Sequence, residues 1–171
     1  MSIVNKPVVS RAIAATYEVL TVFIIALAGL VTYLTFSSRI GLIALMVESV
    51  VLGFAGLVML VILASIYRTS YTLTENELII RTTRLIGGSK TIPLRTINSV
   101  EKTIIPFGIR LFGASFYGGY YYIPSLGRVF LAMTNFQDGL LIKTENGNYI
   151  ITPSKPLDFK TAVESKIRPP A

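Results

Sequence analysis

Two long stretches of the chain that are almost free of charge constrain its fold more than any other feature. Twenty residues without a charged side chain lie between Glu18 and Arg39, and twenty-eight residues with a single charge, Glu48, lie between Arg39 and Arg68. A transmembrane helix needs about 20 mostly apolar residues. The pattern therefore predicts two membrane-spanning helices, at about 17–36 and 42–67.

The two runs are separated by only Ser37, Ser38 and Arg39, so the helices must be antiparallel neighbours. A cleaved signal peptide ending at Ala26-Leu27-Ala28 is a poor alternative, because apolar sequence continues beyond that point. Two buried helices of a soluble domain are also a poor alternative, because 171 residues cannot cover both on all sides. We expect three parts: a tail at 1–12, a transmembrane hairpin at 13–68 and a soluble domain at 69–171.

Small residues and one carboxylate stand out within the hairpin. Glycine and alanine in both runs would let helices approach closely, either within the hairpin or between protomers. They are Ala26, Ala28, Gly29, Gly53, Ala55 and Gly56. Ionisable side chains inside a membrane are costly to bury and are functional candidates by default. For Glu48 three placements are open: the membrane interface, a hydrogen-bonded contact between helices, or an ion or proton pathway.

Basic residues near the ends of the runs predict the orientation. The tail carries Lys6 and Arg11, the hairpin loop carries only Arg39, and the segment after the second run carries Arg68, Arg81 and Arg84. Cytoplasmic segments carry an excess of Lys and Arg. The prediction is a multi-pass protein of the cell membrane with both termini and the soluble domain in the cytoplasm.

Composition excludes several classes of function. The chain has no Cys and no His, so disulfides, thiol chemistry and histidine catalysis are excluded, and a structural zinc site is not expected. The carboxylates after Arg68 are isolated in sequence or lie at a turn, and no spacing marks a catalytic pair. We therefore expect no enzyme activity, no metal and no cofactor. The net charge of +7 favours anionic lipid over nucleic acid as a partner next to a membrane.

After Arg68 the apolar pattern changes to that of short strands. Alternating or β-branched runs bounded by Gly, Asn and Pro predict six or seven strands, at 71–74, 78–83, 90–93, 97–105, 127–134, 140–144 and 149–152. Asn146-Gly147 predicts a hairpin turn before the last of them. Strands without intervening helices favour an antiparallel sheet, sandwich or barrel.

The pattern becomes helical near the C-terminus. Phe159, Ala162, Val163 and Ile167 recur at a spacing of three to four residues, which predicts an amphipathic helix. Pro156 suits its first turn. Such a helix can close one end of a β-domain.

These segments resemble a bacterial pleckstrin-homology (PH) domain of the membrane-associated kind. The resemblance covers Tyr71 to about Glu164 and rests on five pieces: 71–78 (YTLTENEL), 92–97 (IPLRTI), 110–113 (RLFG), 126–127 (LG) and 149–153 (YIITP). It implies a strongly bent antiparallel barrel of about seven strands capped by a C-terminal helix. It implies no particular chemistry, because PH-like folds serve lipid binding, protein binding and scaffolding alike.

One segment departs from what the resemblance leads us to expect. From Phe107 to Tyr122 seven of sixteen residues are aromatic, interrupted by glycine. Either the rings fill the core of the domain, or the segment dips into the headgroup layer or holds a partner. The candidate contact residues are Phe116, Tyr117, Tyr120 and Tyr121.

Basic residues are the candidates for a phosphate-binding surface. The sequence does not decide whether they converge or are scattered; they are Lys90, Arg95, Lys102, Arg110 and Arg128. Segment 87–91 (GGSKT) is not a nucleotide-binding P-loop, because Ser89 stands where that motif needs glycine.

The sequence as a whole predicts a membrane-anchored, non-catalytic PH-like module. It would bind lipid headgroups or a protein partner, including a second copy of itself, at the cytoplasmic face of the membrane. The alternative is a small subunit of a larger membrane complex such as a transporter, in which the hairpin is the working part and the domain is regulatory.

Overall fold

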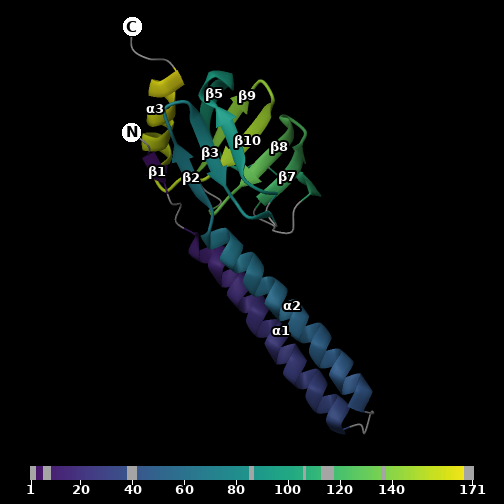
Figure 1. The fold of residues 1–171 in the computed structure, drawn as a ribbon. Coiled ribbons are helices and arrows are strands. Elements are labelled where there is room, and N and C mark those ends of the chain that lie inside the picture. The colour runs from purple at the N-terminus through teal and green to yellow at the C-terminus, as the bar shows by residue number, and fades with distance from the viewer. Residues whose placement is uncertain are drawn as a thin grey trace. The chain divides into compact units, whose positions relative to one another are not determined.

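The structure, a computed structural model, describes residues 3–5, 9–37, 42–84, 87–105, 107–112, 118–135 and 138–167 (Figure 1). The chain forms two compact units. The hairpin unit comprises Arg11–Ala64, and the domain unit comprises Met1–Ser10 together with Ser65–Ala171.

The hairpin unit consists of two helices, α1 (Arg11–Ser37) and most of α2 (Leu42–Tyr67), which lie side by side (Figure 1). Helix α1 and the stretch Met46–Tyr67 of α2 are long and apolar enough to cross a membrane, judged by length and composition. Their side chains are apolar around the whole helix, which is typical of a helix surrounded by lipid rather than by water on one side.

Glu48 contacts the neighbouring helix of the hairpin. Thr35 Oγ1 donates a hydrogen bond to Glu48 Oε2 (2.9 Å) and also contacts the carbonyl oxygen of Val31 (2.8 Å). The Thr35 side chain is buried. Glu48 thus takes part in a hydrogen bond between the two helices.

The glycines of the hairpin line an open groove instead of a tight helix contact. The groove has a volume of 630 Å³ and receives Gly29 from α1 and Gly53 and Gly56 from α2. A methyl group added at any of the three would have no atom within 4 Å. Close approach of α1 to α2 therefore does not depend on these glycines.

The domain unit contains two sheets, as Figure 1 shows. The first has the order β1-β2-β3-β4, formed by Ile3–Asn5, Ser70–Leu73, Glu77–Arg81 and Lys90–Pro93. A 3₁₀ turn, η2 (Leu94–Thr96), leads to the second sheet. That sheet has the order β5-β9-β10-β8-β7-β6, formed by Ile97–Thr103, Gly139–Thr144, Gly147–Ile151, Gly127–Ala132, Gly118–Ile123 and Ile109–Phe112.

This topology differs from the predicted antiparallel barrel in two respects. Over the described residues the two ladders remain separate, so a closed barrel is not confirmed. The prediction of a wholly antiparallel arrangement is wrong at one ladder, because β10 pairs with β8 in parallel. Strands β8 and β9 follow each other in the chain but are not neighbours in the sheet. Strand β10 lies between them, antiparallel to β9 and parallel to β8.

Three strands lie where the sequence pattern predicted none: β1, β6 and β7. The predicted β9–β10 hairpin is confirmed, with one difference. Glu145 and Asn146 form its two-residue loop, so Gly147 pairs with Thr144 instead of lying at the centre of the turn. The positive φ of Gly147 (146°) is one that L side chains rarely adopt.

Each face of the six-stranded sheet carries a cluster of buried apolar side chains. One face packs into a core shared with the first sheet and helix α3, and this core includes Leu78, Phe130 and Phe159. The opposite face carries a second cluster that includes Val129 and Ile150. Helix α3 (Pro156–Ile167), as predicted, packs its apolar face on the shared core, and it contacts β5, η2 and β9.

The N-terminal segment contributes a strand to the domain. Strand β1 pairs antiparallel with β2, placing Ile3 opposite Leu73 and Asn5 opposite Tyr71. Asn5 Oδ1 also accepts hydrogen bonds from the Ser154 amide and hydroxyl (3.1 Å each). Residues 3–5 of the segment expected to be a tail are therefore part of the sheet, and the helical hairpin is an insertion between two paired strands.

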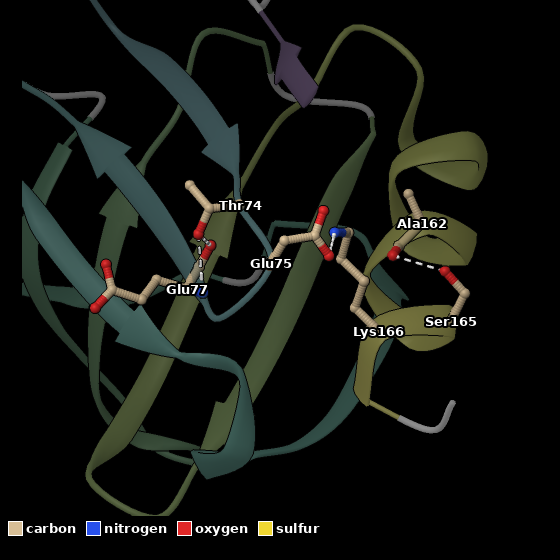
Figure 2. A network of polar contacts seen from close by, with 6 residues as sticks. All are labelled: Thr74, Glu75, Glu77, Ala162, Ser165 and Lys166. Atoms are coloured by element: carbon tan, nitrogen blue, oxygen red, sulfur yellow. Dashed lines mark hydrogen bonds and ion pairs between the residues drawn. The ribbon is translucent and has the colours of Figure 1, made fainter. Parts of the chain in front are cut away.

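A salt bridge ties α3 to the turn between β2 and β3. Figure 2 shows Lys166 of α3 reaching Glu75, with Nζ and Oε2 2.8 Å apart. Thr74 closes the same turn, because its hydroxyl contacts both the carbonyl oxygen (3.0 Å) and the amide (3.1 Å) of Glu77. The hydrogen bond from Lys166 lowers the pKa of Glu75 from its ordinary 4.5 to about 2.

This salt bridge predicts a specific dependence of stability on pH. A carboxyl group whose pKa is depressed by folding stabilises the folded state above its unfolded pKa, and the effect is lost as the pH falls through the folded pKa. We expect Glu75→Gln to lower the thermal midpoint at neutral pH, and the difference from the wild type to vanish between about pH 4.5 and 2. The effect is small because Glu75 is exposed.

The measurement is a thermal melt of both proteins across this pH range. Glu164→Gln is the matched control, since its contact with Lys160 is longer (3.7 Å). A difference between wild type and Glu75→Gln that stays constant down to pH 2 would contradict the assignment.

Candidate functional site

Three aromatic rings meet on neighbouring strands of the six-stranded sheet. Phe130 of β8 lies opposite Tyr120 of β7 on one side and Tyr149 of β10 on the other. The ring centroids of Tyr120 and Phe130 are 5.2 Å apart, and those of Phe130 and Tyr149 are 6.2 Å apart, both in edge-to-face geometry. Phe130 is buried, whereas both tyrosines are partly exposed. The rings thus form one apolar floor with hydroxyl groups at its border.

Two cationic side chains lie over this floor. Lys90 Nζ is 5.1 Å from the ring centroid of Tyr120 and 5.3 Å from that of Phe130, and Arg128 Cζ is 4.3 Å from that of Tyr120. Cations within about 6 Å of a ring face are attracted by its quadrupole. We name these five residues the Lys90–Arg128 cluster; they are Lys90, Tyr120, Arg128, Phe130 and Tyr149.

The pleat of the strands explains why these side chains share one face. Lys90 lies two residues before the buried Ile92 on β4, so both point to the same side of the first sheet. Arg128 lies two residues before Phe130 on β8 and points to the same side of the second sheet. The cluster therefore forms where the shared core opens towards solvent.

The loop between β3 and β4 is shaped to approach this cluster. Gly87 and Gly88 have positive φ angles (114° and 76°), and a Cβ atom on Gly87 would lie 2.9 Å from Phe130 Cε2. Hydrogen bonds between Thr82 and Ser89 close the loop on itself (Oγ of Ser89 to the carbonyl oxygen of Thr82, 3.1 Å). Glycine is thus required at position 87 for two reasons: its φ angle is one that L side chains rarely adopt, and a Cβ atom would collide with the Phe130 ring.

A cavity of 260 Å³ adjoins the cluster. Its lining combines cluster residues with the β9–β10 turn, namely Tyr120, Arg128, Phe130, Asn146, Gly147, Asn148 and Tyr149. Asn148 is held in place because its amide donates a hydrogen bond to the carbonyl oxygen of Leu126 (2.8 Å).

The electrostatics of the cavity favour an anion. Over the described residues, no ion pair joins Lys90 or Arg128 to a carboxylate. Burial raises the pKa of the Tyr149 phenol, Tyr120 acts in the same direction, and Lys90 opposes them. The Tyr149 hydroxyl therefore keeps its proton at neutral pH and can donate a hydrogen bond. Two cations beside such donors can hold a phosphate or carboxylate group.

The remaining predicted basic residues lie elsewhere. Arg95 is in η2, Lys102 forms an ion pair with Asp138 (3.0 Å), and Arg110 is on β6 opposite Tyr121. Of the five predicted cations, the structure brings together only Lys90 and Arg128.

The predicted aromatic residues divide between core and surface. Tyr120 packs against the shared core. Tyr121 packs against the buried apolar side chains on the opposite face of the sheet, which include Val129 and Ile150. Phe107 and Phe112 are exposed. The remaining two predicted contact residues, Phe116 and Tyr117, lie outside the described residues. The described rings of segment 107–122 therefore neither all fill the core nor all lie on the surface.

The sequence analysis did not identify four residues of the site: Phe130, Asn146, Asn148 and Tyr149. The hairpin signal around Asn146-Gly147 was visible, but nothing in it points to a cavity. Only the pairing of β8 with β10 brings Tyr149 beside Phe130.

The acidic side chains of the described part of the chain do not gather into a group that could hold a metal ion. No group of three or more His, Cys, Asp or Glu side chains comes together there. Glu101 is bound by Lys143 (2.9 Å) and Ser99 (2.9 Å), and these hydrogen bonds lower its pKa. Glu101 therefore stays ionised and hydrogen-bonded at neutral pH.

Comparison with known proteins identifies a family that matches the β-rich domain. The family described as "Bacterial PH domain" matches residues 69–167, which is more than half of the chain. No curated protein and no solved structure matches the chain.

Proposed function

The chain belongs to the bacterial PH domain family, and on this premise we propose that it is a membrane-anchored, non-catalytic module that binds anionic lipid headgroups through the Lys90–Arg128 cluster. The family is generally non-catalytic. The observation that carries the proposal is the pair of cations over an aromatic floor, beside a cavity with hydroxyl and amide groups.

The two apolar helices support the membrane part of the proposal. Their length and composition fit a transmembrane hairpin. The pairing of β1 with β2, which flank the hairpin, supports placing both ends of the hairpin on the same side of the membrane. The basic residues of the tail and of the domain favour the cytoplasmic side, so we place both termini there.

The family supports a more detailed assignment of the domain. In this proposal the two sheets are the two layers of a bent PH-like sheet, and α3 is the capping helix. The cluster then lies where the two layers meet at an open edge. Basic residues near an anionic bilayer gain about 1 kcal/mol each, so a pair of cations gives selective but reversible binding.

The alternative, a subunit of a larger membrane complex, has less support. It would rest on Glu48, whose described contact is the hydrogen bond from Thr35 within the hairpin. A contact of this kind stabilises helix packing and is not specific to transport.

The test uses the full-length protein in nanodiscs of zwitterionic phospholipid with increasing fractions of anionic phospholipid. The readout is hydrogen–deuterium exchange at 87–91, 118–123, 127–131 and 146–149. We expect protection that rises with anionic lipid and falls with salt. Lys90→Met combined with Arg128→Gln should weaken the response roughly thirtyfold, since each cation contributes about 1 kcal/mol.

Arg95→Gln is the matched control, because it removes a cation from η2, away from the cluster. It should leave the response unchanged. Equal exchange in zwitterionic and anionic nanodiscs would refute headgroup binding and leave a protein partner as the ligand of this domain.

A further inference from the structure

Strand β6 carries three exposed apolar side chains. Ile109 lies opposite Tyr122 and Phe112 opposite Tyr120, on either side of a register shift, and Ile109, Leu111 and Phe112 are all exposed. Two more exposed apolar residues lie in the connection before the strand: Ile104 and Phe107, the latter 92% exposed. We name these five residues the β6 edge surface; they are Ile104, Phe107, Ile109, Leu111 and Phe112.

The position of β6 makes this exposure unusual. It is the last strand of the six-stranded sheet and pairs only with β7 among the described strands. Soluble proteins protect such edges with charged side chains, proline or a covering element. Here Arg110 is the one charged residue among the twenty-five between Lys102 and Arg128. An apolar edge this free of charge indicates a surface that is covered in the working protein.

The connections to the hairpin limit what can cover it. Only Arg68 and Thr69 lie between the end of α2 and the start of β2. Two residues span at most about 7 Å. If the helices cross a bilayer, as the proposed function holds, the domain stays at the bilayer surface at all times.

We propose that the β6 edge surface inserts into the interfacial layer of the bilayer. This inference rests on the membrane anchoring in the proposed function, but not on headgroup binding by the Lys90–Arg128 cluster. Phenylalanine, leucine and isoleucine are the side chains that bury at this depth, and Arg110 suits the anionic boundary above them. Shallow insertion leaves the unpaired backbone groups of β6 within reach of water.

The shape of the surface favours lipid over a second copy of the chain. Strand pairing between two copies would cover the residues of β6 itself. Ile104 and Phe107 lie outside the strand, in a connection that offers no regular ladder to a partner. A fluid lipid layer covers strand and connection together.

The chain contains no tryptophan, so a single introduced tryptophan reports its own surroundings. Phe107→Trp is tested in the full-length protein, reconstituted in vesicles of purely zwitterionic phospholipid. We expect blue-shifted emission, strong quenching by phospholipids brominated near the headgroup and weak quenching by aqueous iodide. Leu157→Trp, at an apolar position on α3 that is 63% exposed, is the matched control and should behave as a water-exposed residue.

Two outcomes would overturn the proposal. Iodide quenching of Phe107→Trp equal to that of Leu157→Trp would show that the surface stays in water. Blue-shifted emission without quenching by brominated lipid would show a protein contact instead. Ile104→Trp gives a second reading at another exposed position. Since the vesicles carry no anionic lipid, failure here is separate from failure of headgroup binding.

Discussion

Replacing Phe130 with alanine is expected to lower the free energy of unfolding of the domain by about 3–5 kcal/mol. The Phe130 side chain is 1% exposed, and its ring contacts Tyr120, Tyr149 and Lys90. The substitution removes a large buried apolar group and leaves a cavity that the paired strands on both sides cannot close. It should also abolish the floor on which Lys90 and Arg128 lie.

The measurement is native-state hydrogen exchange of the slowest amides in β8, β9 and β10, in the full-length protein. This readout reports the opening of the domain independently of the hairpin. Phe107→Ala is the matched control, because it makes the same chemical change at an exposed ring. It should change stability by no more than about 0.5 kcal/mol. Similar losses for both variants would mean that the core around Phe130 is assigned wrongly.

Replacing Tyr71 with phenylalanine is expected to cost about 1–3 kcal/mol, although only one oxygen atom is removed. The Tyr71 hydroxyl donates a hydrogen bond to the carbonyl oxygen of Ala132 (2.6 Å) and accepts one from the amide of Thr152 (3.3 Å). Burial raises the pKa of Tyr71 to about 12, so the hydroxyl stays protonated at neutral pH. Phenylalanine would leave two buried backbone groups without this partner.

The same exchange experiment measures this effect. Tyr122→Phe is the control, because it removes a hydroxyl from a ring that is largely exposed. A Tyr71→Phe protein as stable as the wild type would mean that Ala132 and Thr152 find other partners. The two hydrogen bonds of Tyr71 would then contribute little to the stability of the domain.

The parts of the fold that follow from sequence are those encoded locally. The absence of charge on either side of Arg39 predicts both long helices, because charge is costly to bury in a membrane. The start of α1 was not predicted, because the helix begins at Arg11 and includes Glu18. The spacing of Phe159, Val163 and Ile167 predicts α3 in the same way. Asn146-Gly147 predicts the β9–β10 hairpin.

Strands β6 and β7 were not predictable by the same reasoning. A strand is recognised by alternation when one face is buried and the other is in water. Tyr120 and Tyr121 point to opposite faces of a sheet that carries buried apolar side chains on each face, so alternation is lost. In β6 the apolar residues Ile109, Leu111 and Phe112 are all exposed and the register shifts within the strand, so alternation is lost there too. Strand β1 exists because β2 offers an edge, and three residues carry no pattern of their own.

The candidate site was predictable only in part. Lys90, Tyr120 and Arg128 were candidates from residue type, but their convergence depends on the pairing of β7 with β8 and on the approach of β4 from the other sheet. Phe130 and Tyr149 become neighbours through the parallel ladder between β8 and β10. This ladder joins two strands that are separated in the sequence by β9, and no short sequence motif specifies their pairing.

The pairing of β1 with β2 also has a consequence for biogenesis. Synthesis begins at the N-terminus, so β1 is complete before either helix exists, and its partner is made only after both. In a membrane protein β1 must therefore wait, unpaired, until the second helix has returned the chain to the starting side and β2 has emerged. A chain whose second helix failed to return would keep β1 and β2 on opposite sides of the bilayer. The short ladder can therefore form only after insertion of the hairpin is complete.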